Sequence, residues 1–303
     1  EITRSDASDT SNDALPASSD IGVYIYGYLG TNNWDISTIQ PNNNTPSRTW
    51  VYRTVGEAVR VNANTKESNL TLTSHSKAPT FPINPDNNTE MERVEIFAIF
   101  PNNTTVTPST SSYQHEVALD QTVEANIIAA DLLTNDKVAY TKEQCEGQSL
   151  QLSLRHRMAK IHVTFVPKAG SDLTAANMPT AFDVLGVKRK VTITPKEGTV
   201  TLDNTAAATT ESAPMKGVVS QSFFIPPQEL AANTTFLKFD IKGNADGKFK
   251  GISGCTFKLP SKTTFAAGTR YEVTVTVDVD FVSVTSTIAP WGEETMPYDP
   301  VVL

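Results

Sequence analysis

The chain has 303 residues, 39% of them hydrophobic and 19% charged, which is enough for one large or two medium folded domains. Its 25 basic and 33 acidic residues give a net charge of −8, and the densest basic cluster is only Lys188-Arg189-Lys190. Nucleic acid is therefore not an expected partner, because a phosphate-binding surface needs clustered Lys and Arg. No apolar run approaches the roughly 20 residues that cross a bilayer.

The first 20 residues combine a short strand-like segment with a polar spacer. Glu1, Ile2 and Thr3 are compatible with a strand, which ends in a lone arginine, Arg4. The spacer that follows, up to Asp20, buries too little apolar surface to offset the entropy of ordering it. The chain has no initiator Met and no signal-like apolar segment, so we expect a mature or trimmed form whose export signal has been removed.

Alternating apolar and polar residues predict strands along most of the remaining chain. Helical periodicity is sparse, and 123–133 fits a helix or a strand equally well. Asp246-Gly247 is a hairpin turn signal. We therefore predict an all-β fold of two β-sandwich domains, mainly antiparallel and with few short helices. The predicted strands before the C-terminal region are Ile21–Tyr28, Thr49–Tyr52, Val94–Phe100, Lys190–Thr194, Thr199–Leu202, Ser222–Ile225, Phe236–Lys242 and Phe249–Ile252.

A change of phase in the middle of the chain indicates a domain boundary. The apolar residues lie at even positions from Leu150 to Leu154 and at odd positions from Ile161 to Phe165. Such a change turns every side chain to the other face of a sheet, and the short basic stretch RHRMAK between them suits a junction. We place the boundary near His156. The predicted divisions are a strand remnant and spacer over 1–20, sandwiches over 21–155 and 156–303, and a C-terminal extension from about 292.

The strongest alternation lies in YEVTVTVDVDF, where every second residue from Tyr271 to Phe281 is apolar. This pattern predicts one long antiparallel strand with a single buried face. The alternation changes phase at Val282. We expect a bulge there, or a strand that changes sheets.

No group of residues predicts catalysis, cofactor binding or a metal site. The four histidines, His75, His115, His156 and His162, are scattered, and solvated or hydrogen-bonded roles are expected for them. The motifs of zinc proteases, serine hydrolases and phosphate-binding loops are absent from the sequence. We therefore expect a protein that is not an enzyme and needs no cofactor.

The two cysteines, Cys145 and Cys255, are far apart and fall in different predicted domains. A disulfide framework or a zinc site is therefore not expected. Free cysteines are usually buried, which leaves burial as the default for both thiols.

Seven stretches in order resemble the fimbrillin-like proteins of Bacteroidales, the subunits of type V pili. They span Ile21 to Trp291 and read IGVYIYGYLG, MERVEIFAIFPNN, AADLLTNDKVAYTK, LQLSLRHRMAKIHVTFV, FFIPPQEL, FAAGTRYEVTVTVDV and STIAPW. The resemblance implies two transthyretin-like β-sandwiches. It also implies a lipoprotein precursor, exported through the outer membrane and anchored by a lipidated cysteine that would precede Glu1.

The resemblance also implies that the subunits assemble at the cell surface by strand exchange, which a protease triggers. A trypsin-like or arginine-specific surface protease removes the first strand, and the C-terminal segment of another subunit fills the groove. By resemblance, Glu1, Ile2 and Thr3 would belong to the displaced strand. The cleavage site would be Arg4, with Arg48 in the loop NNNTPSR as a rival and a disordered terminus with an incidental arginine as the alternative. The donor segment would contain Met296, Tyr298, Val301, Val302 and Leu303.

The expected function is thus a structural and adhesive subunit of a surface fimbria. Its partners would be other pilus subunits, identical or different, the processing protease, and a host or bacterial surface receptor. One alternative is a surface lipoprotein of the same fold that binds a glycan or a host ligand, although the three Trp residues are scattered. Another is an enzyme on a β-sandwich scaffold. The long C-terminal tail favours a stalk subunit, but tip and base positions stay open.

Overall fold

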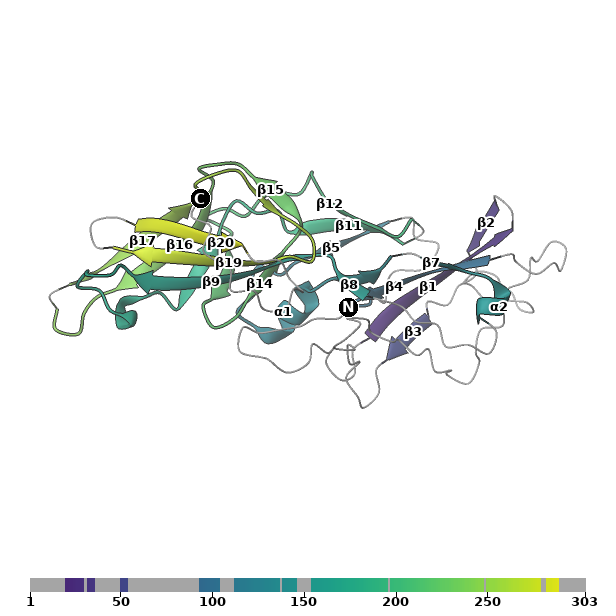
Figure 1. Cartoon of the computed structure of the whole chain (residues 1–303), viewed down its shortest axis with the longest axis horizontal. Coiled ribbons are helices and arrows are strands. Elements are labelled where there is room, and N and C mark those ends of the chain that lie inside the picture. The colour runs from purple at the N-terminus through teal and green to yellow at the C-terminus, as the bar shows by residue number, and fades with distance from the viewer. Residues whose placement is uncertain are drawn as a thin grey trace.

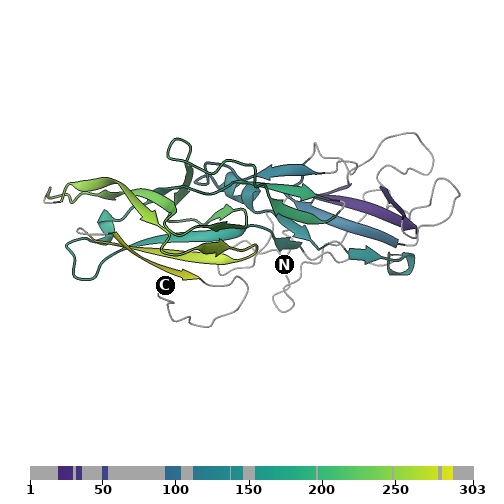
Figure 2. The same ribbon diagram turned by 90° about the horizontal axis from the view of Figure 1, so that it is seen from above.

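The computed structural model describes residues 20–29, 32–35, 50–53, 93–103, 112–136, 138–145, 154–195, 197–247, 249–278 and 282–288 (Figure 1). Most of them lie in strands that form several mainly antiparallel sheets, which confirms the all-β fold class. Figures 1 and 2 show that the molecule is elongated and that these sheets follow one another along its long axis. In the part of the chain that is described, no helix is long and apolar enough to span a membrane.

The first sheet has seven strands and is built around β4, which lies between β1 and the short strands that follow it in the chain. Residues 96–100 of β4 are all buried, so both faces of this central strand are covered. An unbroken apolar run such as IFAIF suits a strand in that position. The strands are β1 (Asp20–Leu29), β2 (Asn32–Asp35), β3 (Trp50–Arg53), β4 (Arg93–Phe100), β6 (Leu133–Asn135), β7 (Val138–Tyr140) and β8 (Leu154–His156).

A three-stranded sheet combines segments that are distant in the sequence. Its order is β12 (Thr199–Leu202), β11 (Lys190–Thr194) and β5 (Tyr113–Glu116), and both pairings are antiparallel. Two α-helices occur among the described residues, α1 (Glu124–Ala130) and the single turn α2 (Lys142–Cys145), and both precede position 156 in the sequence. The ambiguous segment 123–133 is therefore a helix that leads into β6.

The first hydrophobic core lies among these elements and draws on both halves of the sequence. Residues before position 156 that contribute include Phe97 of β4 and Ile127 of α1. Residues after it include Met158, Ile193 of β11 and Phe224. The later half of the chain thus returns to complete the core that the earlier half begins.

The second core lies between two four-stranded sheets. Its aromatic side chains pack closely, with the rings of Phe165 and Phe239 4.6 Å apart between centroids. The first of these sheets contains β13 (Met215–Val218), β10 (Ala181–Val184), β16 (Thr235–Lys242) and β17 (Gly251–Lys258), and the second contains β14 (Phe223–Ile225), β9 (Ala159–Pro167), β19 (Arg270–Val277) and β20 (Val282–Ile288). The pair β15 (Gln228–Leu230) and β18 (Thr263–Phe265) and the short 3-10 helix η1 (Ala175–Asn177) complete the described elements.

The chain passes from one core to the other between β8 and β9. Met158 belongs to the first core and Ala159 to the second, and both are fully buried. Arg157 fixes the crossing from the side, because its Nε donates to Thr134 Oγ1 at 2.6 Å and its Nη2 donates to Asp136 Oδ1 at 2.7 Å. The division of the chain into domains near residue 156 stays a prediction.

Most predicted strands are present, with ends that match or shift by one residue. The bounds of the strand predicted over 249–252 differ more, because β17 begins at Gly251 and runs on to Lys258. Gly251 has a φ of 80°, a left-handed conformation that suits the glycine where β17 starts its pairing with β16.

The long C-terminal strand does not exist as predicted. β19 ends at Val277, and β20 then pairs with it in antiparallel register, with Val277 opposite Val282 and Tyr271 opposite Ile288. The change of phase at position 282 therefore marks a hairpin within one sheet, where a bulge or a change of sheet was expected. The alternating burial of β19 itself is as predicted.

Candidate functional site

β5 has an open edge among the described strands. It pairs with β11 on one side, and no described strand pairs with its other side. The Val117 amide donates to the Arg189 carbonyl at 2.9 Å, and hydrogen-bonded pairs alternate along an antiparallel ladder. The backbone N–H and C=O groups of Gln114 and Glu116 therefore point away from β11. An edge of this kind can pair with a strand from another chain.

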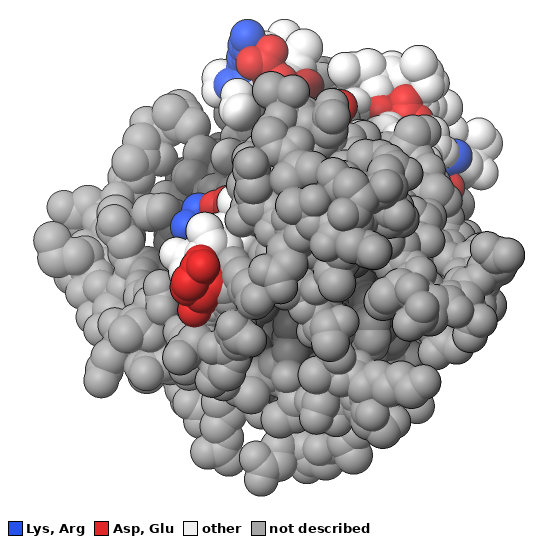
Figure 3. Space-filling model, turned by 90° about the vertical axis from the view of Figure 1, so that its right-hand side faces the viewer, with Lys and Arg blue, Asp and Glu red and all other residues white. Residues whose placement is uncertain are grey.

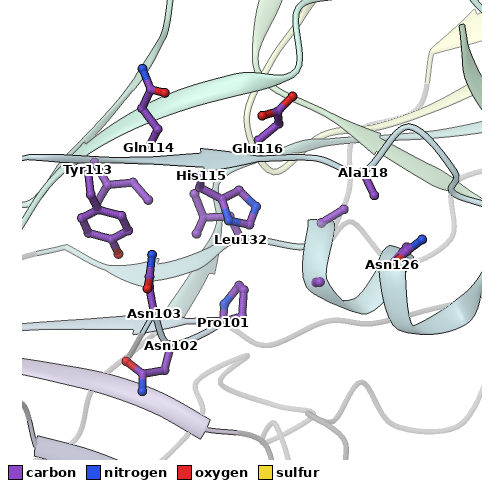
Figure 4. Close-up of a pocket in the computed structure, with 13 residues that line it drawn as sticks. Pro101, Asn102, Asn103, Tyr113, Gln114, His115, Glu116, Ala118, Asn126 and Leu132 are labelled. Carbon is purple, nitrogen blue, oxygen red and sulfur yellow. The ribbon is translucent and has the colours of Figure 1, made fainter. Parts of the chain in front are cut away.

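A hollow of about 330 Å³ lies beside β5, between the end of β4, α1 and β11. Figure 4 shows the side chains of Tyr113 and His115 pointing from β5 toward Pro101, Asn102 and Asn103, as alternation along a strand requires. Gln114 and Glu116 point to the opposite side of β5. No Lys or Arg occurs among the described residues that line the hollow.

Two side chains in the wall of this hollow carry buried polar atoms without hydrogen-bond partners. They are the Nε2 atom of His115 and both polar atoms of the Asn102 amide. Buried polar groups in proteins are nearly always paired with protein atoms or with ordered water. The amide of Asn126, also in the wall, is already engaged, because its Nδ2 donates to the Asp120 carbonyl at 2.7 Å.

His115 is held in its neutral form. The pKa of His115 is lowered from 6.5 to about 4, mainly because the ring is buried. A hydrogen bond to the Ala130 backbone and the negative charge of Asp131 both raise the pKa, but their effects are smaller. Because Nε2 has no partner, the bond to Ala130 runs from Nδ1. Nδ1 then carries the proton, and Nε2 presents a lone pair as a hydrogen-bond acceptor.

Gln121 holds the segment before α1 against the later half of the chain. It is fully buried, its Oε1 accepts from the Phe224 amide, and its Nε2 donates to the Phe224 carbonyl, each at 2.8 Å. The side chain thus binds the edge of β14 as a neighbouring strand would. This fixes α1, and with it one wall of the hollow, relative to the crossing between the cores.

The other histidines contribute to different parts of the structure. His156 is buried and its Nδ1 lies 2.6 Å from Asp131 Oδ1. His162 lies on β9 beside Glu272 of β19, and burial lowers its pKa while Glu272 raises it. Among the described residues, no group of three or more His, Cys, Asp or Glu could hold a metal ion.

Figure 3 shows one end of the molecule, where both Lys or Arg (blue) and Asp or Glu (red) side chains are visible among the described residues. The ion pairs among the described residues include Arg155 with Asp136 at 3.0 Å and Lys262 with Glu229 at 2.8 Å.

The comparisons with known proteins fit this all-β architecture. The family model described as fimbrillin-like matches residues 10–291, which is most of the chain. The chain belongs to the fimbrillin-like family. None of the curated proteins matches this sequence.

Solved structures resemble this fimbrillin-like chain in fold. A proposed cell adhesion protein of Bacteroides uniformis is 19% identical with a TM-score of 0.57, and the match covers 93% of this chain and 95% of that one. A second, from Bacteroides ovatus, is 14% identical with a TM-score of 0.54, over 92% and 89% of the two chains. A fimbrial protein of Bacteroides vulgatus is 12% identical with a TM-score of 0.47, over 89% and 92%.

The processing and donor residues predicted for this fimbrillin-like protein lie outside the described residues. They are Glu1, Ile2, Thr3, Arg4, Arg48, Met296, Tyr298, Val301, Val302 and Leu303. The side chain of Cys145 is also outside them. Cys255 on β17 is a free thiol that is only partly buried, and burial raises its pKa.

Sequence reasoning missed the hollow. Asn102 and Tyr113 were not among the predicted site residues, and His115 was expected to be an ordinary solvated or hydrogen-bonded histidine. The only signal was the alternation of Tyr113 and His115 in YQHE, which is too short to predict a strand.

Proposed function

We propose that this protein is a structural and adhesive subunit of a cell-surface fimbria. The observation that carries the proposal is the match of the fimbrillin-like family over residues 10–291. The same family points to a non-enzymatic role, with other pilus subunits as partners. A receptor on a host or bacterial surface would complete the adhesive function.

The subunit would assemble by strand exchange. A trypsin-like or arginine-specific protease would cut after Arg4, with Arg48 as the rival site, and release the strand that contains residues 1–3. The C-terminal segment of a neighbouring subunit would then add to an open sheet edge, in a groove that the removed strand had filled. Each apolar side chain buried in such a groove contributes about 1.5–3 kcal/mol.

The open edge of β5 supports this mechanism physically. The backbone groups of Gln114 and Glu116, which pair with no described strand, can form a ladder with an incoming strand, and the apolar residues 301–303 can supply buried side chains. Before processing, the chain would be a lipoprotein precursor, exported through the outer membrane, with its signal and lipidated cysteine upstream of residue 1.

Limited trypsin digestion of the purified chain tests the proposal. We expect loss of a peptide that ends at Arg4, a stable core by intact mass, and new oligomers or fibres in the electron microscope. An Arg4→Gln variant should stay monomeric, whereas Arg48→Gln should behave like the unaltered chain. Deletion of 296–303 should permit cleavage at Arg4 but abolish fibres.

Other outcomes would contradict the mechanism. A first cut at Arg48 would rule out Arg4 as the processing site. A chain that is cut at Arg4 yet stays monomeric when concentrated would rule out assembly by strand exchange.

A further inference from the structure

We propose that Thr134 and Asp136 hold Arg157 in place and thereby protect the connection between the two cores from the protease that processes this subunit. The inference rests on the proposed function, because it concerns how an arginine-specific protease would distinguish Arg4 from an arginine inside the folded chain. Thr134 and Asp136 are positioning residues in this role, since they act through Arg157.

The stretch RHRMAK has the sequence of a protease target. Arg157 and Met158 form the connection between β8 and β9 and belong to neither strand. Cuts in folded proteins concentrate in connections of this kind when the chain there can open. A cut after Arg157 would sever the chain next to the point where it passes from the first core to the second.

The guanidinium group of Arg157 is bound by three acceptors from one short segment. Its Nε donates to Thr134 Oγ1 at 2.6 Å, and its Nη2 donates to the Asn135 carbonyl at 3.2 Å and to Asp136 Oδ1 at 2.7 Å. The bond to the carboxylate is charge-assisted, and it is the main reason that the pKa of Asp136 is lowered. Asp136 also pairs with Arg155 at 3.0 Å, so one carboxylate holds both arginines of RHR.

The segment that supplies these acceptors is anchored in the first sheet. It contains β6, which pairs with β4 on one side and with β8 on the other. The side chain of Asn135 adds two further bonds, because its Nδ2 donates to the Ile96 carbonyl at 2.9 Å and its Oδ1 accepts from the Ala98 amide at 2.7 Å. The acceptors cannot follow Arg157 outward, so its contacts are lost when the connection opens.

The backbone on both sides of the bond after Arg157 is also paired. The Arg157 amide donates to the Leu132 carbonyl at 2.8 Å, and the Met158 carbonyl accepts from the Gly268 amide at 2.9 Å. The side chain of Met158 is fully buried. A protease can cut here only after local opening, and the rate then follows the population of the open form. The contacts of the Arg157 side chain lower that population.

The test is digestion of the full chain with an arginine-specific protease, followed by mass measurement under denaturing conditions. Denaturation is needed because the two fragments would stay together through the β5–β11 ladder and the hydrogen bonds between Gln121 and Phe224. A synthetic peptide of residues 153–161 gives the rate for the open sequence. We expect the unaltered chain to be cut after Arg157 at least about a hundredfold more slowly than this peptide, and later than at Arg4.

Matched variants locate the protection. Asp136→Ala and Thr134→Val should each raise the rate of cleavage after Arg157 by about tenfold or more, whereas Asp136→Glu, which keeps the carboxylate, should restore most of the resistance. The control is Glu229→Ala, which removes another half-exposed carboxylate, paired with Lys262 at 2.8 Å. It should leave the rate after Arg157 unchanged.

Three results would overturn the proposal. In the first, the unaltered chain is cut after Arg157 as fast as the peptide. In the second, neither Asp136→Ala nor Thr134→Val changes this rate. In the third, both variants are cut equally fast at Arg270, inside β19, which would mean that they loosen the whole fold. An uncut Arg4 in the unaltered chain would contradict the proposed function instead, and the rates after Arg157 would still decide the present proposal.

Discussion

At the scale of single residues, His115 is notable because the fold keeps it neutral and only one of its two ring nitrogens is hydrogen bonded. Its Nδ1 is bound to the Ala130 backbone, and its Nε2 lies unpaired in the wall of the hollow. A histidine that is buried in this way resists protonation, and the cost of protonating it appears in the stability of the whole chain.

The stability of the protein should fall as the pH drops from about 6.5 to about 4. The pKa of His115 is about 4 in the folded chain and 6.5 when unfolded, so the unfolded state takes up the proton first. The contribution is fully present above pH 6.5, and its loss amounts to about 3 kcal/mol at pH 4. Urea unfolding at a series of pH values measures it.

The variant His115→Gln should remove this part of the pH dependence, because glutamine does not titrate. His162→Gln serves as the control and leaves the contribution of His115 in place. If the free energy of unfolding of the unaltered chain and of His115→Gln changed in parallel between pH 6.5 and pH 4, the assignment to His115 would be wrong.

At the scale of elements, the start of β17 shows how backbone contacts limit which residue a strand can begin with. A Cβ atom at Gly251 would lie 2.6 Å from the Ile241 carbonyl oxygen and 2.7 Å from the Gly243 nitrogen, and φ at this position is 80°. Gly247, in the turn before it, has a φ of 73° but nothing within 4 Å of such a Cβ.

We expect Gly251→Ala to destabilise the protein more than Gly247→Ala. Both substitutions impose positive-φ strain of about 1–3 kcal/mol, but only the first adds a clash with backbone that cannot move aside. Chemical denaturation of the two variants measures the difference. Equal losses of stability would mean that the β16–β17 connection relaxes to accept the extra atom.

The elements also show how far the sequence could predict the fold. β4 and β19 were predictable, because one has an unbroken apolar run and the other a long alternation. β5 was not, since its four residues gain their strand conformation from β11, which lies far along the chain. The β19–β20 hairpin was missed because a change of phase looks the same for a bulge, a change of sheet and a turn.

The hollow could not be predicted for a related reason. Asn102, His115 and Ile193 are brought together only by the pairing of β5 with β11 and by the position of α1. A hollow lined by common residues from four elements leaves no pattern along the chain.

At the scale of the whole molecule, the two cores depend on each other. β11 and β12 follow the crossing near residue 156 in the sequence, yet β11 pairs with β5, β12 pairs with β11, and both pack on the first core. The alternation of the ladder directs the amides of Val191 and Ile193 toward β5 and those of Thr192 and Thr194 toward β12.

A fragment of residues 156–303 should therefore differ from the whole chain at particular amides. Without β5, we expect Val191 and Ile193 to exchange their amide hydrogens rapidly, whereas in the whole chain they should be protected. Thr192 and Thr194, which bond within the β11–β12 hairpin, are the internal control and should lose less protection. Slow exchange of Val191 and Ile193 in the fragment would show that the second half folds independently of β5.

The double connection between the cores has a mechanical consequence. A single covalent linker acts as a hinge, but here the crossing at Arg157 and Met158 is accompanied by the β5–β11 ladder at a separate place. Two attachments resist both bending and twisting between the cores. In a filament built from such subunits, flexibility would be concentrated at the joints between neighbours, and the length of each rigid segment would equal that of one subunit.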